Sequence, residues 1–278
     1  MTNQSTGISK PVFLLSVACA GLAGISAALF GRWINESEKV AFLNAELNAL
    51  TAAPFNLATA PYPRANDGRV QGGTDARHKQ QSQWAQDSVK AGGGSVVLVG
   101  DSITHAWEGN MDLLKDTGTF VNLATSGDRT ENVLWRLQNG NLPAGLKPRA
   151  FVVMIGTNNT GHRMDKPEDI AAGVHAILKR LHNYSSDTPI ILYNIFPRGA
   201  KSDDAMRVNN EKANKLVVDG LTEDLKKVVR VRDLASKYLE ADGTLPKTIM
   251  PDLLHPNRKG YEIWAEDLKA GQIGRAHV

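Results

Sequence analysis

Short apolar runs alternate with longer amphipathic stretches from residue 95 to residue 269. Five runs rich in β-branched residues predict buried strands, at residues 96–99, 120–123, 150–155, 190–195 and 228–231. Between the third and fourth runs, apolar residues recur at helical spacing from Ile170 to Leu181, which predicts a helix that covers a sheet. Further helices are predicted over residues 203–224 and 259–269. Strands that alternate with helices predict one three-layer α/β domain with a parallel sheet.

The first 94 residues lack this alternation. Nineteen residues without a charge, 12–30, follow Lys10, which predicts a signal peptide or a membrane anchor over residues 1–31. The length favours an anchor, whereas the many small residues favour cleavage after Ala20 or Ala28. Both alternatives predict an exported protein, in the periplasm, outside the cell, or attached to the membrane through this segment only.

Residues 32–94 are predicted to connect this segment to the α/β domain. They hold a predicted helix at 38–50, a stretch rich in Pro, Gly, Asn and Thr at 53–73, and a second helix around 77–90. The α/β domain is predicted over residues 95–271. Residues 272–278 lack the apolar spacing to continue the last helix, and 273–278 match one reading frame of a widely used sequencing adapter. We therefore expect this tail to be non-native.

Composition excludes several classes of function. The net charge is only +3 and no basic stretch is interleaved with aromatic residues, so nucleic-acid binding is not expected. The single cysteine, Cys19, excludes an intramolecular disulfide and a cysteine-rich metal site. Neither a histidine-rich metal motif nor a nucleotide-binding glycine loop is present. We expect neither a metal nor a cofactor.

Candidate site residues follow three of the predicted strands. Gly100, Asp101 and Ser102 come directly after the first strand, Gly127 lies just beyond the second, and Asn158 stands at the end of the third. The carboxyl ends of parallel strands meet at one edge of a sheet, where ligands bind in α/β proteins. These three segments are therefore expected to form one site.

The chemistry of this site needs a base, because a serine hydroxyl is a poor nucleophile at neutral pH. Asp252 and His255 are bracketed by Pro251 and Pro256, which favour a stiff extended loop. His255 is predicted to take the proton of Ser102, and Asp252 to hold the imidazole. The backbone N–H groups of Ser102 and Gly127, with the Asn158 side chain, are predicted to stabilise an oxyanion.

These residues carry a family resemblance. Ser102, Gly127, Asn158 and His255 stand in the order of the four blocks of the SGNH superfamily, so the chain resembles a GDSL-type hydrolase. Gly127-Asp128-Arg129-Thr130 and residues 133–140 resemble the branch that contains the catalytic subunits of intracellular platelet-activating-factor acetylhydrolase and exported bacterial carbohydrate acetylesterases, and Phe196-Pro197-Arg198-Gly199 also fits that branch. The resemblance covers roughly residues 96–268. It implies a flavodoxin-like SGNH-hydrolase fold with a five-stranded parallel sheet.

Four further residues are candidates for substrate contact. His105 lies one helical turn past Ser102, Trp107 is close behind it, and Asn159 and His162 follow Asn158. For each of them a role in packing, or at the surface, is the competing interpretation. An aromatic residue beside a nucleophile, such as Trp107, is as often part of the core.

The predicted activity is hydrolysis of an ester through an acyl-enzyme, with short acetyl-like groups removed from carbohydrates. Two alternatives remain open. One is a phospholipid or lipid acylhydrolase of the platelet-activating-factor acetylhydrolase type. The other is a non-catalytic binding or scaffolding protein on the same fold. The substrate is expected to be a small acyl ester such as an acetylated saccharide, and a homodimer is compatible with the sequence.

Overall fold

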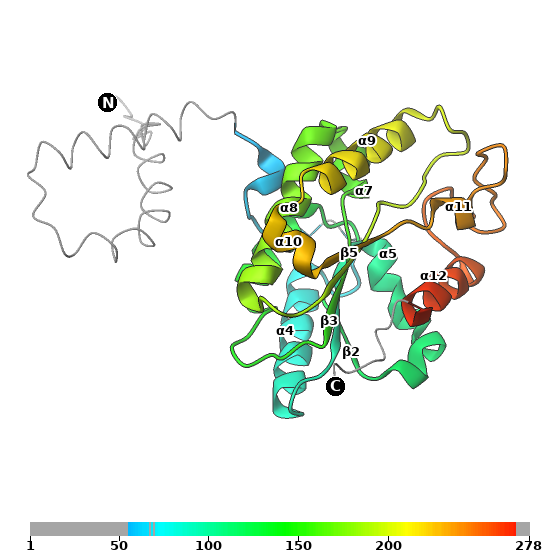
Figure 1. Ribbon diagram of the computed structural model, residues 1–278. Coiled ribbons are helices and arrows are strands. Elements are labelled where there is room, and N and C mark those ends of the chain that lie inside the picture. Colours follow the sequence, from blue (N-terminus) through cyan, green and yellow to red (C-terminus); the bar gives the residue numbers. More distant parts are fainter. Residues whose placement is uncertain (1–54, 67, 69, 271–278) are drawn as a thin grey trace, which may run out of the picture. The chain divides into compact units, whose positions relative to one another are not determined.

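The structure, a computed structural model, describes residues 55–66, 68 and 70–270 (Figure 1). The predicted signal peptide or anchor at 1–31, the predicted helix at 38–50 and the suspected non-native tail at 272–278 lie outside the described residues. None of the helices in the described ranges combines the length and the apolar character that crossing a membrane requires.

Five parallel strands form a single sheet in the order β2-β1-β3-β4-β5. Each strand hydrogen-bonds to its neighbours in parallel register, for example Val97 beside both Val121 and Phe151. The strands are β1 (Val96–Gly100), β2 (Phe120–Asn122), β3 (Ala150–Met154), β4 (Ile190–Tyr193) and β5 (Val229–Arg232). This sheet confirms the predicted α/β fold, and its strand order is that of flavodoxin-like proteins.

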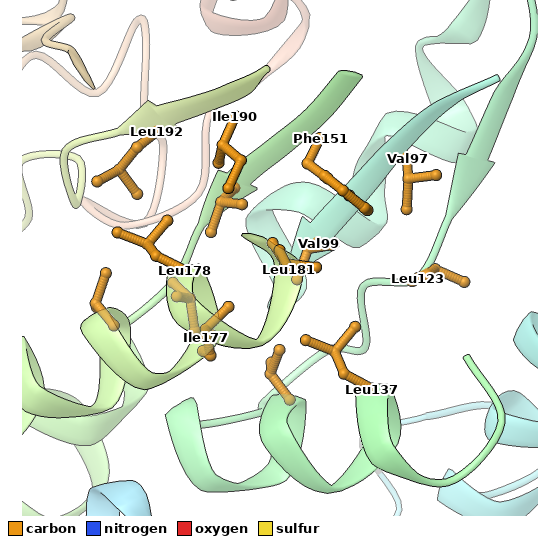
Figure 2. Close-up of a cluster of buried hydrophobic side chains, with 14 of the residues drawn as sticks. Val97, Val99, Leu123, Leu137, Phe151, Ile177, Leu178, Leu181, Ile190 and Leu192 are labelled. Atoms are coloured by element: carbon orange, nitrogen blue, oxygen red, sulfur yellow. The ribbon is translucent and has the colours of Figure 1, made fainter. Parts of the chain in front are cut away.

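One face of the sheet is covered by five helices. Val97, Val99 and Phe151 project from the strands into a cluster with Leu178 and Leu181 of α8 (Figure 2). Because side chains alternate along a strand, every second residue of β1 and β3 enters this cluster. The covering helices are α4 (Thr74–Lys90), α6 (Thr130–Gln138), α8 (Pro167–Tyr184), α9 (Ala205–Asp219) and α10 (Glu223–Val228).

The opposite face carries the remaining strand residues. Leu98 and Met154 pack in a second buried cluster with Trp107 and Trp264, whose ring centroids lie 5.1 Å apart. The elements on this face are α5 (Ser102–His105), η2 (Ala106–Gly109), η3 (Met111–Thr117), α11 (Ala235–Tyr238) and α12 (Arg258–Ala270). Two apolar clusters separated by the sheet explain why the strands are hydrophobic on both faces.

The helix predicted over residues 203–224 is two helices. α9 ends at Asp219 and α10 begins at Glu223, with Gly220 and Thr222 as the flanking caps. The apolar pattern continues across the break because Val217 and Leu225 enter the same cluster. The pattern therefore predicts the buried face correctly and misses the turn.

Residues 56–94 differ from a connector. Starting with η1 (Leu57–Thr59), they belong to the same compact unit as the sheet. Thr130 Oγ1 donates a hydrogen bond to the Ala58 carbonyl oxygen (2.8 Å), and Gln81 Nε2 donates to the Ala124 carbonyl oxygen (2.8 Å). The described part of the stretch rich in proline and glycine is thus bound to the domain, here through the Ala58 carbonyl oxygen.

A short helix, α7, follows strand β3. α7 (Thr157–Arg163) begins two residues after Ile155, at the carboxyl end of β3. Thr157, Asn158 and Asn159 lie in its first turn and are buried. The strand and this helix place the Asn158 side chain at the carboxyl edge of the sheet.

Candidate active site

The site lies where the strand order reverses. β1 and β3 are neighbours in the sheet, and the chain leaves their carboxyl ends toward β2 on one side and β4 on the other. In open α/β sheets, ligands bind in the crevice at this switch point. β1 leads directly into Ser102, and β3 leads into Asn158.

The turn that presents Ser102 is tightly packed. A Cβ atom on Gly100 would lie 2.3 Å from Thr104 Oγ1 and 2.4 Å from the Met154 carbonyl oxygen, so a side chain does not fit there. Asp101 caps α5, because its Oδ1 accepts a hydrogen bond from the Ile103 N–H (3.0 Å). Ser102 is then the first residue of the helix, with its hydroxyl at the carboxyl edge of the sheet.

Ser102, His255 and Asp252 form a hydrogen-bonded chain. Ser102 Oγ lies 2.9 Å from His255 Nε2, and His255 Nδ1 lies 2.6 Å from Asp252 Oδ2. A carboxylate only accepts hydrogen bonds, so Nδ1 carries the proton and Nε2 of the neutral ring is left to accept the serine hydroxyl. The structure therefore brings together the three residues that the sequence predicts as nucleophile, base and acid.

The acid is held by its own loop. Asp252 Oδ1 also accepts hydrogen bonds from the backbone N–H groups of Leu254 (3.1 Å) and His255 (2.7 Å). Partial burial raises the pKa of Asp252, but the hydrogen bonds from the His255 ring and backbone outweigh it and hold the pKa below its usual range. Leu253 adopts a left-handed conformation, with φ at 60°, and its carbonyl oxygen accepts the Gly199 N–H (2.9 Å).

Gly127 lies in a tight turn beside the third segment. The Asp128 N–H donates to the Thr125 carbonyl oxygen (3.1 Å), and Gly127 has a φ of 84°. These values match a type II turn, whose third residue needs positive φ and is therefore usually glycine. The Asn158 side chain donates to the Asp128 carbonyl oxygen (2.9 Å), so one predicted oxyanion donor is bound to the residue that follows the other.

Two of the four candidates for substrate contact are part of the protein interior. Trp107 is fully buried and packs against Tyr261 and Trp264. Asn159 is also fully buried; its Oδ1 accepts the Thr130 N–H (3.0 Å) and its amide nitrogen faces Asp165 Oδ2 (3.0 Å). Neither side chain offers a surface to a substrate, so both predictions are corrected to structural roles.

The two histidines lie nearer to solvent. His162 is exposed and contacts Arg129 Nη1 through Nδ1 (3.4 Å). His105 is half-buried, and its Nδ1 accepts the Ser126 N–H (3.2 Å) with Ser126 Oγ at 2.8 Å. Burial and the nearby Arg77 lower the pKa of His105, which keeps the ring neutral and able to accept these bonds. His105 thus binds Ser126, the residue that precedes Gly127.

Two arginines near the site were not predicted as site residues. Arg198 donates to the Thr157 carbonyl oxygen (2.9 Å) and Oγ1 (3.1 Å), directly before Asn158. Arg64 donates to the Ser126 carbonyl oxygen and pairs with Asp128 (3.3 Å). The motif Phe196-Pro197-Arg198-Gly199 could have drawn attention to Arg198 in the sequence. Arg64 lies in a proline-rich stretch and belongs to no motif that would have pointed to it.

Within the described ranges, no cluster of three or more His, Cys, Asp or Glu side chains has a geometry that could hold a metal ion. The polar groups at the site are a hydroxyl, an imidazole, a carboxylate, an amide and backbone N–H groups. Such a set can transfer protons, carry an acyl group on oxygen and bind a developing negative charge.

A family model matches most of the predicted α/β domain. The model of the GDSL-like lipase/acylhydrolase family matches residues 98–263, which is more than half of the chain. This range contains Ser102, Gly127, Asn158, Asp252 and His255 and begins after the segment with Arg64.

Two curated relatives are similar over most of their length. Platelet-activating factor acetylhydrolase IB subunit alpha1 from Homo sapiens is 31% identical over 169 residues, covering 60% of this chain and 70% of the relative. Subunit alpha2 from Gallus gallus is 32% identical over 201 residues, covering 70% of this chain and 82% of the relative.

Solved structures share the fold. A putative platelet activating factor from Streptococcus pneumonia aligns with a TM-score of 0.58 and 21% identity, covering 71% of this chain and 91% of that one. The acetyl xylan esterase AlAXEase aligns with a TM-score of 0.52 and 15% identity, covering 64% of this chain and 99% of that one.

Proposed function

The chain belongs to the GDSL-like lipase/acylhydrolase family and is a carboxylic ester hydrolase, and from this premise we propose that it removes short acyl groups, such as acetyl, from a polar alcohol such as a saccharide. The proposed nucleophile is Ser102, with His255 as general base and Asp252 as its partner. The hydrogen-bonded chain from Ser102 Oγ through the imidazole to the Asp252 carboxylate is the observation that carries this proposal.

In the first half of the reaction, Ser102 Oγ attacks the carbonyl carbon of the ester while its proton passes to His255 Nε2. The tetrahedral intermediate places its negative charge on the former carbonyl oxygen. The N–H groups of Ser102 and Gly127 and the Asn158 amide are the proposed donors to this oxyanion. The intermediate collapses, the bond to the alcohol oxygen breaks, and His255 returns the proton to the leaving alcohol.

In the second half, water replaces the alcohol. His255 Nε2 takes a proton from the water as its oxygen attacks the acyl carbon on Ser102, and a second oxyanion forms in the same place. Collapse releases the carboxylic acid, and the proton returns to Ser102 Oγ. Asp252 keeps the same imidazole orientation through both halves, because its two oxygens bind the His255 ring and the His255 backbone N–H.

Two observations support a short acyl group and a polar alcohol. The curated relatives are named acetylhydrolases, which supports an acetyl-sized acyl group. The other two members of the hydrogen-bonded chain are polar and open to solvent, since the side chains of His255 and Asp252 are 41% and 57% exposed. Of the described residues, the exposed large hydrophobic ones are Phe55, Leu57, Met164 and Val218. None of these four belongs to the segments that carry Ser102, Gly127 or His255.

The second candidate is a lipid acylhydrolase. It is favoured by the name of the same relatives, whose printed substrate is platelet-activating factor. The partly buried Leu253 and Leu254, next to His255, would give such a substrate a small apolar contact. The two candidates share the reaction at Ser102 and differ in the alcohol that leaves.

Hydrolysis of p-nitrophenyl acetate by the parent protein and by Ser102→Ala tests the reaction. We expect the parent to turn over and the variant to lose at least about 1,000-fold in kcat. Equal rates would refute the serine mechanism, and an inactive parent would favour the binding or scaffolding alternative.

A panel of substrates then tests the alcohol. Acetylated xylose oligomers and acetylated glycerophospholipids are compared at equal concentration, with a long-chain ester as a control for acyl length. The proposal predicts the highest kcat/KM for the acetylated saccharides. A preference for the phospholipid would select the second candidate, and a preference for the long-chain ester would contradict both.

A further inference from the structure

The peptide unit between Ser126 and Gly127 lies in the type II orientation, and a flip of this unit would change which group it offers a substrate. In a type II turn the central peptide is rotated by about half a turn relative to a type I turn, so its N–H and its carbonyl exchange sides. Gly127 has no Cβ atom and tolerates both conformations. In the proposed mechanism, the observed type II orientation supplies the N–H donor to the oxyanion, and the flipped orientation would put a carbonyl oxygen in its place.

In the structure, the type II orientation is held by a hydrogen bond to the Ser126 carbonyl oxygen. Arg64 Nη1 donates to the Ser126 carbonyl oxygen, which belongs to the same planar peptide unit as the Gly127 N–H. In a trans peptide the two groups point in opposite directions. A guanidinium that binds the carbonyl therefore fixes where the Gly127 N–H points.

The same guanidinium also binds the residue on the other side of Gly127. Arg64 Nη1 lies 3.3 Å from Asp128 Oδ1, and both side chains are almost completely buried. Arg136 holds the remaining oxygen of Asp128 (2.6 Å). Buried, charge-assisted contacts of this kind are strong and directional. Arg64 therefore binds the turn on both sides of Gly127, at Ser126 and at Asp128.

Arg64 is itself fixed in place by neighbouring contacts. Its carbonyl oxygen accepts Thr74 Oγ1 (3.0 Å), and two residues earlier the Tyr62 carbonyl oxygen accepts Asn132 Nδ2 (3.2 Å). The Tyr62 hydroxyl accepts Arg129 Nη2 (2.7 Å). The segment 56–66 thus brings a buried arginine to the predicted oxyanion donor, although it lies before the residues that the family model matches.

From these contacts we infer that Arg64 is a positioning residue for the oxyanion donor Gly127, and that residues 56–66 are part of the catalytic unit. The inference rests on the proposed serine ester hydrolysis. The printed contacts of Arg64 are with the turn that carries Gly127, namely the Ser126 carbonyl oxygen and the Asp128 carboxylate. It acts by keeping the Ser126–Gly127 peptide in the orientation that stabilises the transition state.

Arg64→Met tests this role, with Arg149→Met as the matched control. Arg149 also donates a guanidinium hydrogen bond to a backbone carbonyl oxygen, that of Thr117 (2.5 Å), but it stands at the amino end of β3, away from the site. Both variants are expected to lower the melting temperature. Only Arg64→Met is expected to lower kcat, by about 100-fold with KM within about threefold, since loss of one oxyanion donor typically costs about 100–1,000-fold.

Arg64→Lys decides the question if Arg64→Met does not fold. Lysine keeps the positive charge beside Asp128, but its single ammonium group cannot reproduce the planar guanidinium contacts. We expect a folded variant with kcat lower by about tenfold or more and KM unchanged. A kcat within about threefold of the parent in a folded variant at position 64 would overturn the inference, as would an equal loss in Arg149→Met.

Ser102→Ala, measured in the same assay, separates this inference from the proposed function. If it abolishes hydrolysis while Arg64→Met and Arg64→Lys do not lower kcat, the inference alone fails. If Ser102→Ala retains the parent rate, the proposed mechanism fails and the inference falls with it.

Discussion

Replacing Asp101 by asparagine is expected to change how folding stability depends on pH. Asp101 is completely buried next to Ser102, and its Oδ1 accepts the Ile103 N–H (3.0 Å). Its Oδ2 has no hydrogen-bond partner within the described part of the chain. Burial, helped by the nearby Asp128, raises the pKa of Asp101 from 3.8 to about 7. Asparagine has the same shape, keeps the capping oxygen and never ionises.

The sign follows from proton linkage. A carboxyl group with a higher pKa in the folded state binds its proton more tightly there than in the unfolded state. Its favourable contribution to the free energy of unfolding is therefore complete below the pKa of the unfolded state. It is lost as the pH rises toward the folded pKa. Each pH unit between about 4 and 7 therefore lowers the stability of the parent, relative to the variant, by about 1.4 kcal/mol. The full loss is about 4 kcal/mol above pH 7, and the part between pH 5 and pH 8 is about 3 kcal/mol.

Urea unfolding of the parent and Asp101→Asn at pH 5 and pH 8 measures this difference. The new amide N–H₂ adds a constant cost of about 1–3 kcal/mol wherever it finds no acceptor, so the change between the two pH values is the decisive quantity. Asp219→Asn serves as a control, because Asp219 is exposed and pairs only with Lys215 in an exposed helical pair. It is expected to change stability by less than about 1 kcal/mol at either pH. A pH-independent effect of Asp101→Asn would refute the reasoning.

Three further predictions concern the site. Asp252→Asn is expected to lower kcat by about 10,000-fold at neutral pH, because asparagine stabilises the wrong tautomer of His255; a steady-state assay showing less than tenfold loss would contradict this role. The rate of ester hydrolysis is expected to fall at acidic pH, because a protonated imidazole cannot accept the serine proton; a rate that does not fall on acidification would exclude His255 as the base. Gly100→Ala is expected to destabilise the fold by about 3 kcal/mol or more, measured by urea unfolding. The reason is that its Cβ would lie 2.3 Å from Thr104 Oγ1 and 2.4 Å from the Met154 carbonyl oxygen. A variant as stable as the parent would contradict this prediction.

The sheet was predictable because its three central strands, β1, β3 and β4, are buried on both faces. Residues 96–99 and 150–155 are almost continuously apolar, as parallel strands covered by helices must be. The short helix α6 was not predicted, because it buries polar residues such as Glu131 and Asn132 alongside Val133. Their burial depends on partners such as Arg163, which donates to Glu131 (2.7 Å) from 32 residues away. A hydrophobic pattern carries no information about such partners.

The site was predictable to the extent that it is local in sequence. Asp252 and His255 are three residues apart in a loop between prolines, so their pairing follows from the chain itself. The burial of Trp107 is decided by α12, more than 150 residues later, and could not be predicted from its position near Ser102. The contact between Arg64 and the Ser126 carbonyl spans 62 residues and is likewise a property of the fold.

The predicted assignments that concern the ends of the chain stay predictions. A signal peptide or anchor at residues 1–31, export and a homodimer are compatible with the described domain and depend on parts or partners outside it. The same holds for the suspected non-native tail at residues 272–278.

The central claim is that Ser102 carries the acyl group. Titrating the protein with a phosphonofluoridate that mimics an acetyl ester, followed by peptide mass spectrometry, tests it most directly. The account predicts one phosphonyl adduct per chain, located on Ser102, that forms in proportion to the loss of ester hydrolysis. Inactivation with the adduct on another residue, or undiminished hydrolysis with Ser102 fully labelled, would contradict it.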